Sequence, residues 1–208
     1  MATTFKRLGA GNLATANDIV TAYTVPLLCK AIIKSFIISN GSASTVSVTV
    51  RFASTAIMYT YVMKPNDTIL VPAMDQLLIA QSSITISANA GNSISYYISG
   101  IEALVTDPEY SYVVRLGLGT IPVSSGTIVN ANSSIDRIVK GIVLCNTYAS
   151  DAKVSIEVFG RSILQAITVK TLETILVPTS DLFIPSTEYM TASASSGGVH
   201  YYITGKEL

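Results

Sequence analysis

Few side chains in this sequence are suited to catalysis or metal binding. His200 is the only histidine, and Cys29 and Cys145 are the only cysteines. A zinc site needs several Cys or His ligands at short spacings, and a Ser-His-Asp triad needs a histidine that an acid holds in place. His200 lies between Val199 and Tyr201 in a strand-like segment, which favours a structural or solvent-facing role. We therefore expect no catalytic residue, no metal site and no cofactor.

The acidic residues are the remaining candidates for general acid-base chemistry. Two acids recur in similar surroundings in the two halves of the chain, Asp75 with Asp181 and Glu102 with Glu207. Glycoside hydrolysis would require two carboxyl groups at one site, whereas these acids occur singly at strand ends or in loops. Their dispersion predicts turn capping and ion pairing. An enzyme such as a cell-wall hydrolase is the disfavoured alternative.

Tyrosine is abundant, with 11 residues, while tryptophan is absent. In each adjacent pair of tyrosines, alternation along a strand places one ring on each face, so one ring is expected in the core and the other against a protein partner. A sugar-stacking surface of exposed tyrosines is the alternative. The candidate interface residues are Tyr59, Tyr61, Tyr96, Tyr97, Tyr201 and Tyr202.

The composition favours contacts with other proteins. Charged residues make up 12% of the chain, about half of the ~25% usual in soluble domains, and protein partners can cover such a surface at a low desolvation cost. The 13 basic and 13 acidic residues are scattered, so no basic cluster indicates a nucleic-acid site. Lys30 and Lys34 interrupt the most apolar region, which predicts a soluble protein without a membrane span.

The elements that must position these residues occur twice. Thr68–Pro72 recurs identically at residues 174–178, Ile32–Asn40 is answered by Ile138–Asn146, and the offset between matched blocks drifts only from 108 to 105. A fixed order of matched blocks indicates tandem duplication. We expect a first copy over residues 1–104, a linker over residues 105–111, and a second copy over residues 112–208.

Each copy has the pattern of an all-β domain. In Val46–Val50, apolar residues alternate with Ser47 and Thr49, which is typical of a half-buried strand. Turn signals at short intervals predict about eight strands per copy. Gly9–Gly11 and Gly117–Gly119 are interpreted as tight bends. The predicted fold is two tandem β-sandwich domains of jelly-roll-like architecture.

Four segments of the first copy resemble small β-sandwich modules of tailed bacteriophages, which occur among virion structural proteins. They are Phe5–Gly9, Tyr23–Pro26, Ala31–Asn40 and Val46–Val50. The second copy has Ile128–Ala131 where the first has the Tyr23 block, so its assignment depends partly on the duplication. The resemblance implies a capsid decoration or cement protein, or a tail, baseplate or fibre component, and it implies no catalytic residues.

These observations predict a non-enzymatic virion structural protein, synthesised in the host cytoplasm, that binds other capsid or tail proteins. Three chains of two similar domains would form a ring of six domains, so a homotrimer is the expected oligomer. No cofactor and no nucleic acid are expected. A receptor- or carbohydrate-binding module on the virion, with a glycan as ligand, is the alternative function.

Overall fold

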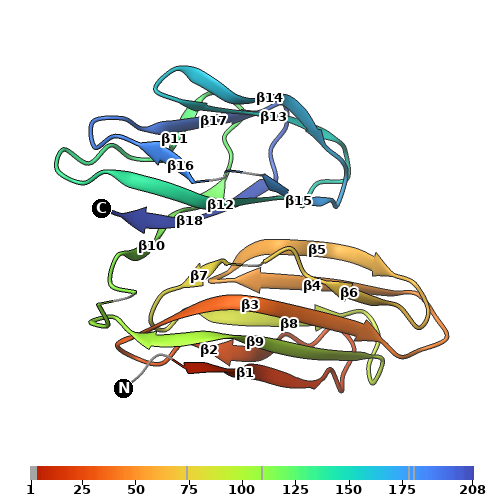
Figure 1. Cartoon of the computed structure of the whole chain (residues 1–208). Helices are drawn as coiled ribbons and strands as arrows, with labels where there is room; N and C mark the ends of the chain where they lie inside the picture. Colours follow the sequence, from red (N-terminus) through yellow and green to blue (C-terminus); the bar gives the residue numbers. More distant parts are fainter. Residues whose placement is uncertain (1–3, 74, 109, 178, 180) are drawn as a thin grey trace. The chain divides into compact units, whose positions relative to one another are not determined.

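The chain folds entirely into β-strands and connecting loops where the structure describes it. The structure is a computed structural model that describes residues 4–73, 75–108, 110–177, 179 and 181–208. Eighteen strands and no helix occur in these residues (Figure 1). The chain divides into two compact units, Met1–Ser111 and Tyr112–Leu208. The all-β prediction is confirmed.

The first unit contains two antiparallel sheets. One sheet has the strand order β1-β9-β3-β6, with the short strand β7 also paired to β3, and the other has the order β2-β8-β4-β5. The strands are β1 Thr4–Asn12, β2 Val20–Thr24, β3 Cys29–Asn40, β4 Val46–Phe52, β5 Thr55–Met63, β6 Thr68–Leu70, β7 Leu77–Leu78, β8 Ser83–Ala88 and β9 Ile94–Leu104.

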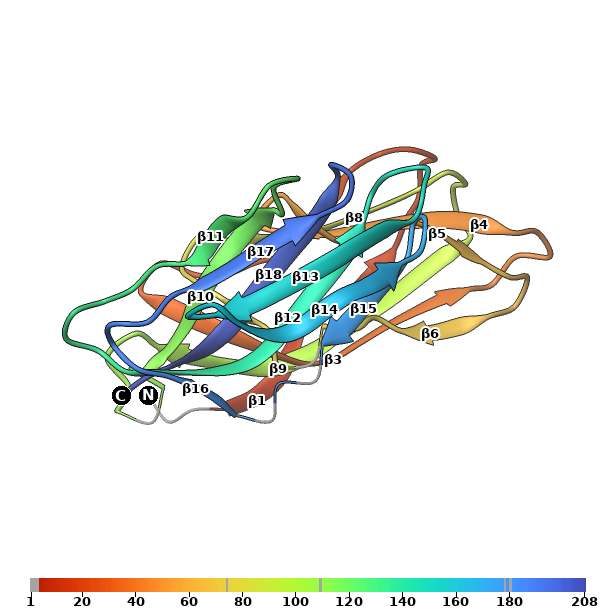
Figure 2. The same cartoon turned by 90° about the horizontal axis from the view of Figure 1, so that it is seen from above.

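The second unit repeats this arrangement. Its sheets have the orders β10-β18-β12-β15, with β16 also paired to β12, and β11-β17-β13-β14, and the second of these sheets is seen face-on in Figure 2. The strands are β10 Val113–Thr120, β11 Gly126–Val129, β12 Arg137–Asn146, β13 Ala152–Val158, β14 Arg161–Val169, β15 Thr174–Val177, β16 Leu182–Ile184, β17 Met190–Ala194 and β18 Val199–Glu207.

Both units have jelly-roll connectivity. In each unit, one sheet takes the first, last, third and sixth strands, and the other takes the second, the second-to-last, the fourth and the fifth. The seventh strand, β7 or β16, is a short addition. This order is that of two Greek keys wrapped into a double sheet, which defines a jelly roll. The predicted fold of two sandwich units is confirmed.

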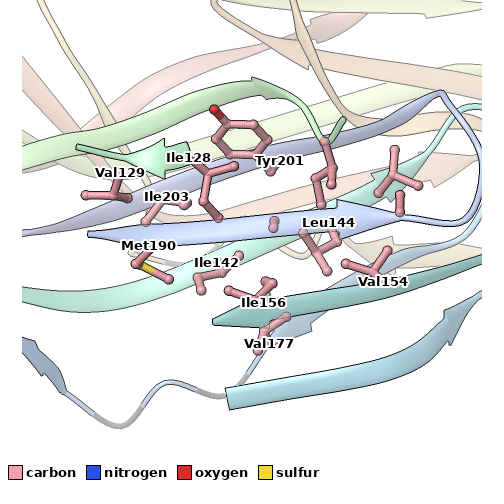
Figure 3. Close-up of a cluster of buried hydrophobic side chains, with 14 of the residues drawn as sticks. Ile128, Val129, Ile142, Leu144, Val154, Ile156, Val177, Met190, Tyr201 and Ile203 are labelled. Atoms are coloured by element: carbon pink, nitrogen blue, oxygen red, sulfur yellow. The ribbon is translucent and has the colours of Figure 1, made fainter. Parts of the chain in front are cut away.

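The core of the second unit lies between its two sheets (Figure 3). Ile142 and Leu144 of β12 and Ile203 of β18 face Val154 and Ile156 of β13, and all five side chains are completely buried. Alternation along each strand places these residues on the inner faces. Burial of each such side chain stabilises the fold by about 1.5 to 3 kcal/mol.

The first unit is built in the same way. Phe36 and Ile38 of β3 and Ile98 of β9 are buried on one sheet, and Val48 and Val50 of β4 are buried on the other. The residues between them on each strand are more exposed. The alternation read from the sequence therefore identifies the inner face of β4 correctly.

A β-bulge interrupts the third strand of each unit. The extra residue is Lys34 in β3 and Lys140 in β12, where the pairing with the last strand shifts register. Lys34 forms an ion pair with Asp75, and Lys140 forms one with Asp181. The lysines and aspartates shared by the two copies thus mark the same bulge, and the ion pairing expected for these acids is observed.

The glycine pairs interpreted as tight bends lie inside strands instead. Gly9 in β1 and Gly117 in β10 each follow a register shift. A Cβ atom on Gly9 would lie 2.4 Å from the carbonyl oxygen of Ala22, and one on Gly117 would lie 2.4 Å from that of Ile128. The bend interpretation is wrong, because glycine here allows two strands to approach closely without turning the chain.

Candidate functional site

The tyrosine pair of the first unit lies on the two faces of β9. Tyr97 is on the outer face and is 47% exposed. Tyr96 is on the opposite face and is half-buried. It pairs with Gly11 on β1, where a Cβ atom would lie 2.9 Å from the Tyr96 hydroxyl. Gly11 thus makes room for the Tyr96 ring, and Tyr97 is the member of the pair that is open to solvent.

The tyrosine pair of the second unit is buried. Tyr201 belongs to the core cluster and is 9% exposed, while Tyr202 has no exposed surface. Burial raises the pKa of Tyr202 to about 12, although Arg115 acts in the opposite direction. Tyr201 is corrected as an interface candidate, because ring area that the core of its own unit already buries is not available to a partner. Tyr202 lies on the opposite face of β18 and is absent from that core cluster.

Tyr59 and Tyr61 of β5 point to opposite faces because a bulge separates them. Thr60 has a φ of 47°, and its N–H group donates to the Thr49 hydroxyl at 3.0 Å. Tyr61 pairs with the core residue Val48 and is 39% exposed. The half-buried Tyr59 stacks on the Arg51 guanidinium, with 5.7 Å between the guanidinium carbon and the ring centroid. The two rings therefore do not form one stacking surface.

Tyr97 is part of an apolar row that crosses the whole sheet. Ala10 pairs with Tyr97, Tyr97 with Ile37, and Ile37 with Leu70, so these residues of β1, β9, β3 and β6 share one face. Ile37 is 39% exposed and Leu70 is 54% exposed. We call Ala10, Tyr97, Ile37 and Leu70 the Tyr97 row. It is a strip of apolar side chains in contact with solvent.

A polar row lies beside the Tyr97 row on the same face. Asn12, Ser95, Ser39 and Thr68 are its members, two residues further along the same four strands. The hydroxyl oxygens of Ser39 and Thr68 are 2.8 Å apart. We call the two rows together the Tyr97 face. None of its eight residues is charged, so a partner can cover it without desolvating an ion.

The sequence indicated Tyr97 but not Ile37 and Leu70 as its companions. Ile32–Ile38 is apolar on both faces except at Lys34 and Ser35, which is typical of a strand that a second sheet or a neighbouring subunit covers, and Ile37 is its exposed member. Leu70 lies in a short strand whose register with β3 is not encoded in a local pattern. The four members of the row come together only through pairing between segments that are distant in the sequence.

A polar cluster at one end of the first unit joins three strands. The Glu102 carboxylate accepts hydrogen bonds from Lys6 of β1 and from the Tyr23 hydroxyl of β2, the latter at 2.5 Å. Burial alone would raise the pKa of Glu102, but the bonds from Lys6 and Tyr23 outweigh it and lower that pKa. Burial and the Glu102 charge raise the pKa of Tyr23. The cluster ties β2 to the facing sheet as a structural brace.

Strand pairing brings Cys145 and His200 to directly opposed positions on β12 and β18. No local pattern in the sequence indicates this pair, because it depends on the register between two distant strands. Cys145 is completely buried, whereas a cysteine nucleophile must reach its substrate. The position therefore suits packing better than covalent catalysis.

Metal-binding clusters and membrane-spanning helices are absent from the described residues. Among them, no group of three or more His, Cys, Asp and Glu side chains is placed to hold a metal ion. Over the same residues, no helix has the length and apolar character needed to cross a membrane.

Comparison with known proteins gives matches of low similarity among solved structures. No family model matches the sequence, and no curated protein matches it. The major capsid protein P2 from Bacteriophage PM2 is similar over 99% of this chain and 97% of its own, with 9% identity and a TM-score of 0.35. The STIV MCP is similar over 100% and 96%, with 9% identity and a TM-score of 0.33. Both are viral capsid proteins. The jelly-roll topology assigned above follows from the strand order of this chain itself.

Proposed function

We propose that this chain is a non-enzymatic structural protein of a bacteriophage virion that assembles through protein-protein contacts. The observation that carries the proposal is the Tyr97 face, an uncharged sheet surface with three half-exposed apolar side chains. A protein partner can cover such an uncharged strip at a low desolvation cost. The likeness of the first copy to phage β-sandwich modules supports the same setting.

The proposed place of the protein is the virion, after synthesis in the host cytoplasm. It serves there as a capsid decoration or cement protein, or as a component of the tail, baseplate or fibre. Its partners are other virion proteins, and neither a cofactor nor nucleic acid takes part. The two units with equal strand order support a homotrimer, since three chains would present six similar sandwiches to a six-fold or three-fold partner.

The position and copy number of the protein in purified particles test this function. Quantitative mass spectrometry of particles, with antibody labelling in electron micrographs, should detect the chain as a constant component. About sixty or more copies per particle would favour the shell, because closed shells repeat each contact many times. A small multiple of six would favour the tail. Absence of the chain from particles would overturn the proposal.

A receptor- or carbohydrate-binding module is the alternative that this experiment does not test. Tyr61, with 39% of its surface exposed, is the aromatic side chain on β5 that a sugar could reach. A glycan array that showed saturable binding, lost in the Tyr61→Ala variant and kept in Tyr97→Ala, would favour this alternative over assembly. Absence of glycan binding is the expected result.

A further inference from the structure

We propose that the Tyr97 face pairs two copies of this chain about a two-fold axis that runs along the strands between β9 and β3. The partner of the Tyr97 face is thus a second copy of this chain, and the inference rests on the proposed assembly function. The contact is isologous, so each copy contributes the same residues. This two-fold contact is separate from the contacts that would build the proposed trimer. It would join two chains that belong to different trimers.

The apolar row is complementary to itself under this operation. The axis reverses the row in the second copy, so Tyr97 faces Ile37 of the second copy and Leu70 faces Ala10 of the second copy. Each contact places a larger side chain against a smaller one. Side chains of two facing sheets interdigitate in this way when the sheets pack about 10 Å apart.

The polar row is complementary to itself as well. The same axis places Ser95 opposite Ser39 of the second copy, and Asn12 opposite Thr68 of the second copy. A hydroxyl group both donates and accepts hydrogen bonds, and so does an asparagine amide. Identical rows of such groups can therefore satisfy one another. A row made only of carboxylates or only of ammonium groups could not pair with its own copy.

The absence of charge on the Tyr97 face favours a second copy over a charged partner. A carboxylate, an ammonium group or a phosphate placed against these eight residues would lose water without gaining an opposite charge, which is costly. A second Tyr97 face brings no charge into the contact. Arg7 lies on the same side of the sheet in the next row, where it opposes Ser99 and stays outside the two rows of the Tyr97 face.

The size of the face predicts a weak contact. Four strands about 4.8 Å apart, with three residues of ~3.3 Å each, describe a patch of roughly 200 Å². A standard interface buries about 800 Å² on each partner. We therefore expect pairing only at high protein concentration in solution. Many copies fixed on one particle would strengthen it by raising their effective concentration.

Sedimentation of the full chain tests whether the Tyr97 face self-associates. The variant is Ile37→Lys, and the matched control is Ile19→Lys, which changes an isoleucine in a loop of the same unit that is 71% exposed. The average mass of wild type and of the control should rise with concentration. Ile37→Lys should weaken this association at least about tenfold, because each pair would bury two unpaired lysines.

Circular dichroism and thermal unfolding of both variants show whether the fold is kept, and an exposed position predicts that it is. Equal association of Ile37→Lys and wild type would overturn the inference. So would a wild-type chain that sediments as a single species at every concentration up to the millimolar range.

Thiol crosslinking tests the axis itself. In a Cys29→Ser background, a chain with Tyr97→Cys is mixed with a chain with Ile37→Cys and treated with a short bis-maleimide, because strands that face one another about 10 Å apart are too distant for a disulfide. The two-fold contact predicts a covalent pair that contains one chain of each kind. A mixture of the Ile37→Cys and Ile19→Cys chains is the control and should give no such pair.

The outcome separates this inference from the proposed function. A chain that is found in particles, but is not crosslinked and does not self-associate, would overturn the pairing and leave the assembly function standing. A chain that pairs through Tyr97 and Ile37 but is absent from particles would overturn the assembly function and leave the pairing standing. Loss of particle incorporation in Ile37→Lys, without any change in self-association, would assign the face to another virion protein and overturn the pairing.

Discussion

Two buried asparagines hold equivalent loops in the two units. Asn40 is 1% exposed and donates to the carbonyl oxygens of Ser44 and Lys64. Asn146 has no exposed surface and donates to the carbonyl oxygens of Ser150 and Val169. Each asparagine side chain thus donates hydrogen bonds to carbonyl groups of two turns. Strand pairing provides no donor for these carbonyl groups. The shared asparagine at the end of the third strand has a structural reason.

We predict that Asn146→Ala lowers the free energy of unfolding of the second unit by about 2 to 3 kcal/mol, because buried backbone groups lose their partner. Chemical unfolding followed by circular dichroism measures this change, since the chain has no tryptophan. Asn132→Ala is the control, because the Asn132 side chain accepts a hydrogen bond from the Ser134 N–H group in an exposed turn. Equal destabilisation by the two variants would contradict the prediction.

The buried phenol of Tyr202 predicts a loss of stability at high pH. Its pKa is raised from 10.0 to about 12, so the folded state favours the neutral form. The stability that depends on the neutral Tyr202 phenol is fully present below pH 10, and it is lost as the pH rises from about 10 through about 12. The shift corresponds to about 3 kcal/mol. Unfolding free energies of wild type and Tyr202→Phe across this range measure it, and parallel decreases would count against it.

At the scale of elements, the last strand of each unit depends on a glycine opposite the bulge. In β18, a Cβ atom on Gly205 would lie 2.2 Å from the carbonyl oxygen of Ile138 and 2.4 Å from the Cδ1 atom of Leu116. Gly100 of β9 has the same relation to Ile32 and Leu8. Gly100 and Gly205 each lie three residues after a tyrosine pair. Both positions require glycine because two central strands approach closely there.

We predict that Gly205→Ala destabilises the second unit by at least about 2 kcal/mol, because β12 and β18 must separate to admit a methyl group. Gly197→Ala is the matched control, since a Cβ atom on Gly197 meets nothing within 4 Å. That substitution should be neutral or slightly stabilising through the unfolded chain. Thermal unfolding of the two variants measures the difference. A Gly205→Ala protein as stable as the control would refute this account of the strand contact.

At the scale of the whole molecule, each unit has a complete set of jelly-roll strands and its own core. Residues 112–208 contain all nine strands of the second unit and the whole of its core cluster. A domain of this size can bury enough apolar surface to fold alone, although with a modest margin of stability.

We predict that residues 112–208, produced alone, fold to a β-sheet protein with a cooperative unfolding transition. Circular dichroism and calorimetry measure this, with the full chain as reference. A fragment that shows no transition would contradict the domain boundary proposed at residues 105–111.

Local patterns in the sequence predicted the strands and the repeat of the strand blocks. The alternation in Val46–Val50 predicted β4 and its inner face, because strand periodicity is a property of neighbouring residues. Register across strands follows no such local rule. A single bulge at Thr60 reverses the face of Tyr61, and the burial of Tyr202 could not be read from a Tyr-Tyr pair that looks the same in both copies.

The Tyr97 face also combines features that the sequence indicates with features that depend on the tertiary structure. Its tyrosine was recognisable in the sequence, as was the apolar strand beside it. Only the tertiary structure decided that Ala10, Tyr97, Ile37 and Leu70 form one row, since they come from four segments joined by non-local hydrogen bonds. Pairing of distant segments depends on the packing energy of the whole sandwich, and a one-residue slip would turn each of these side chains to the other face.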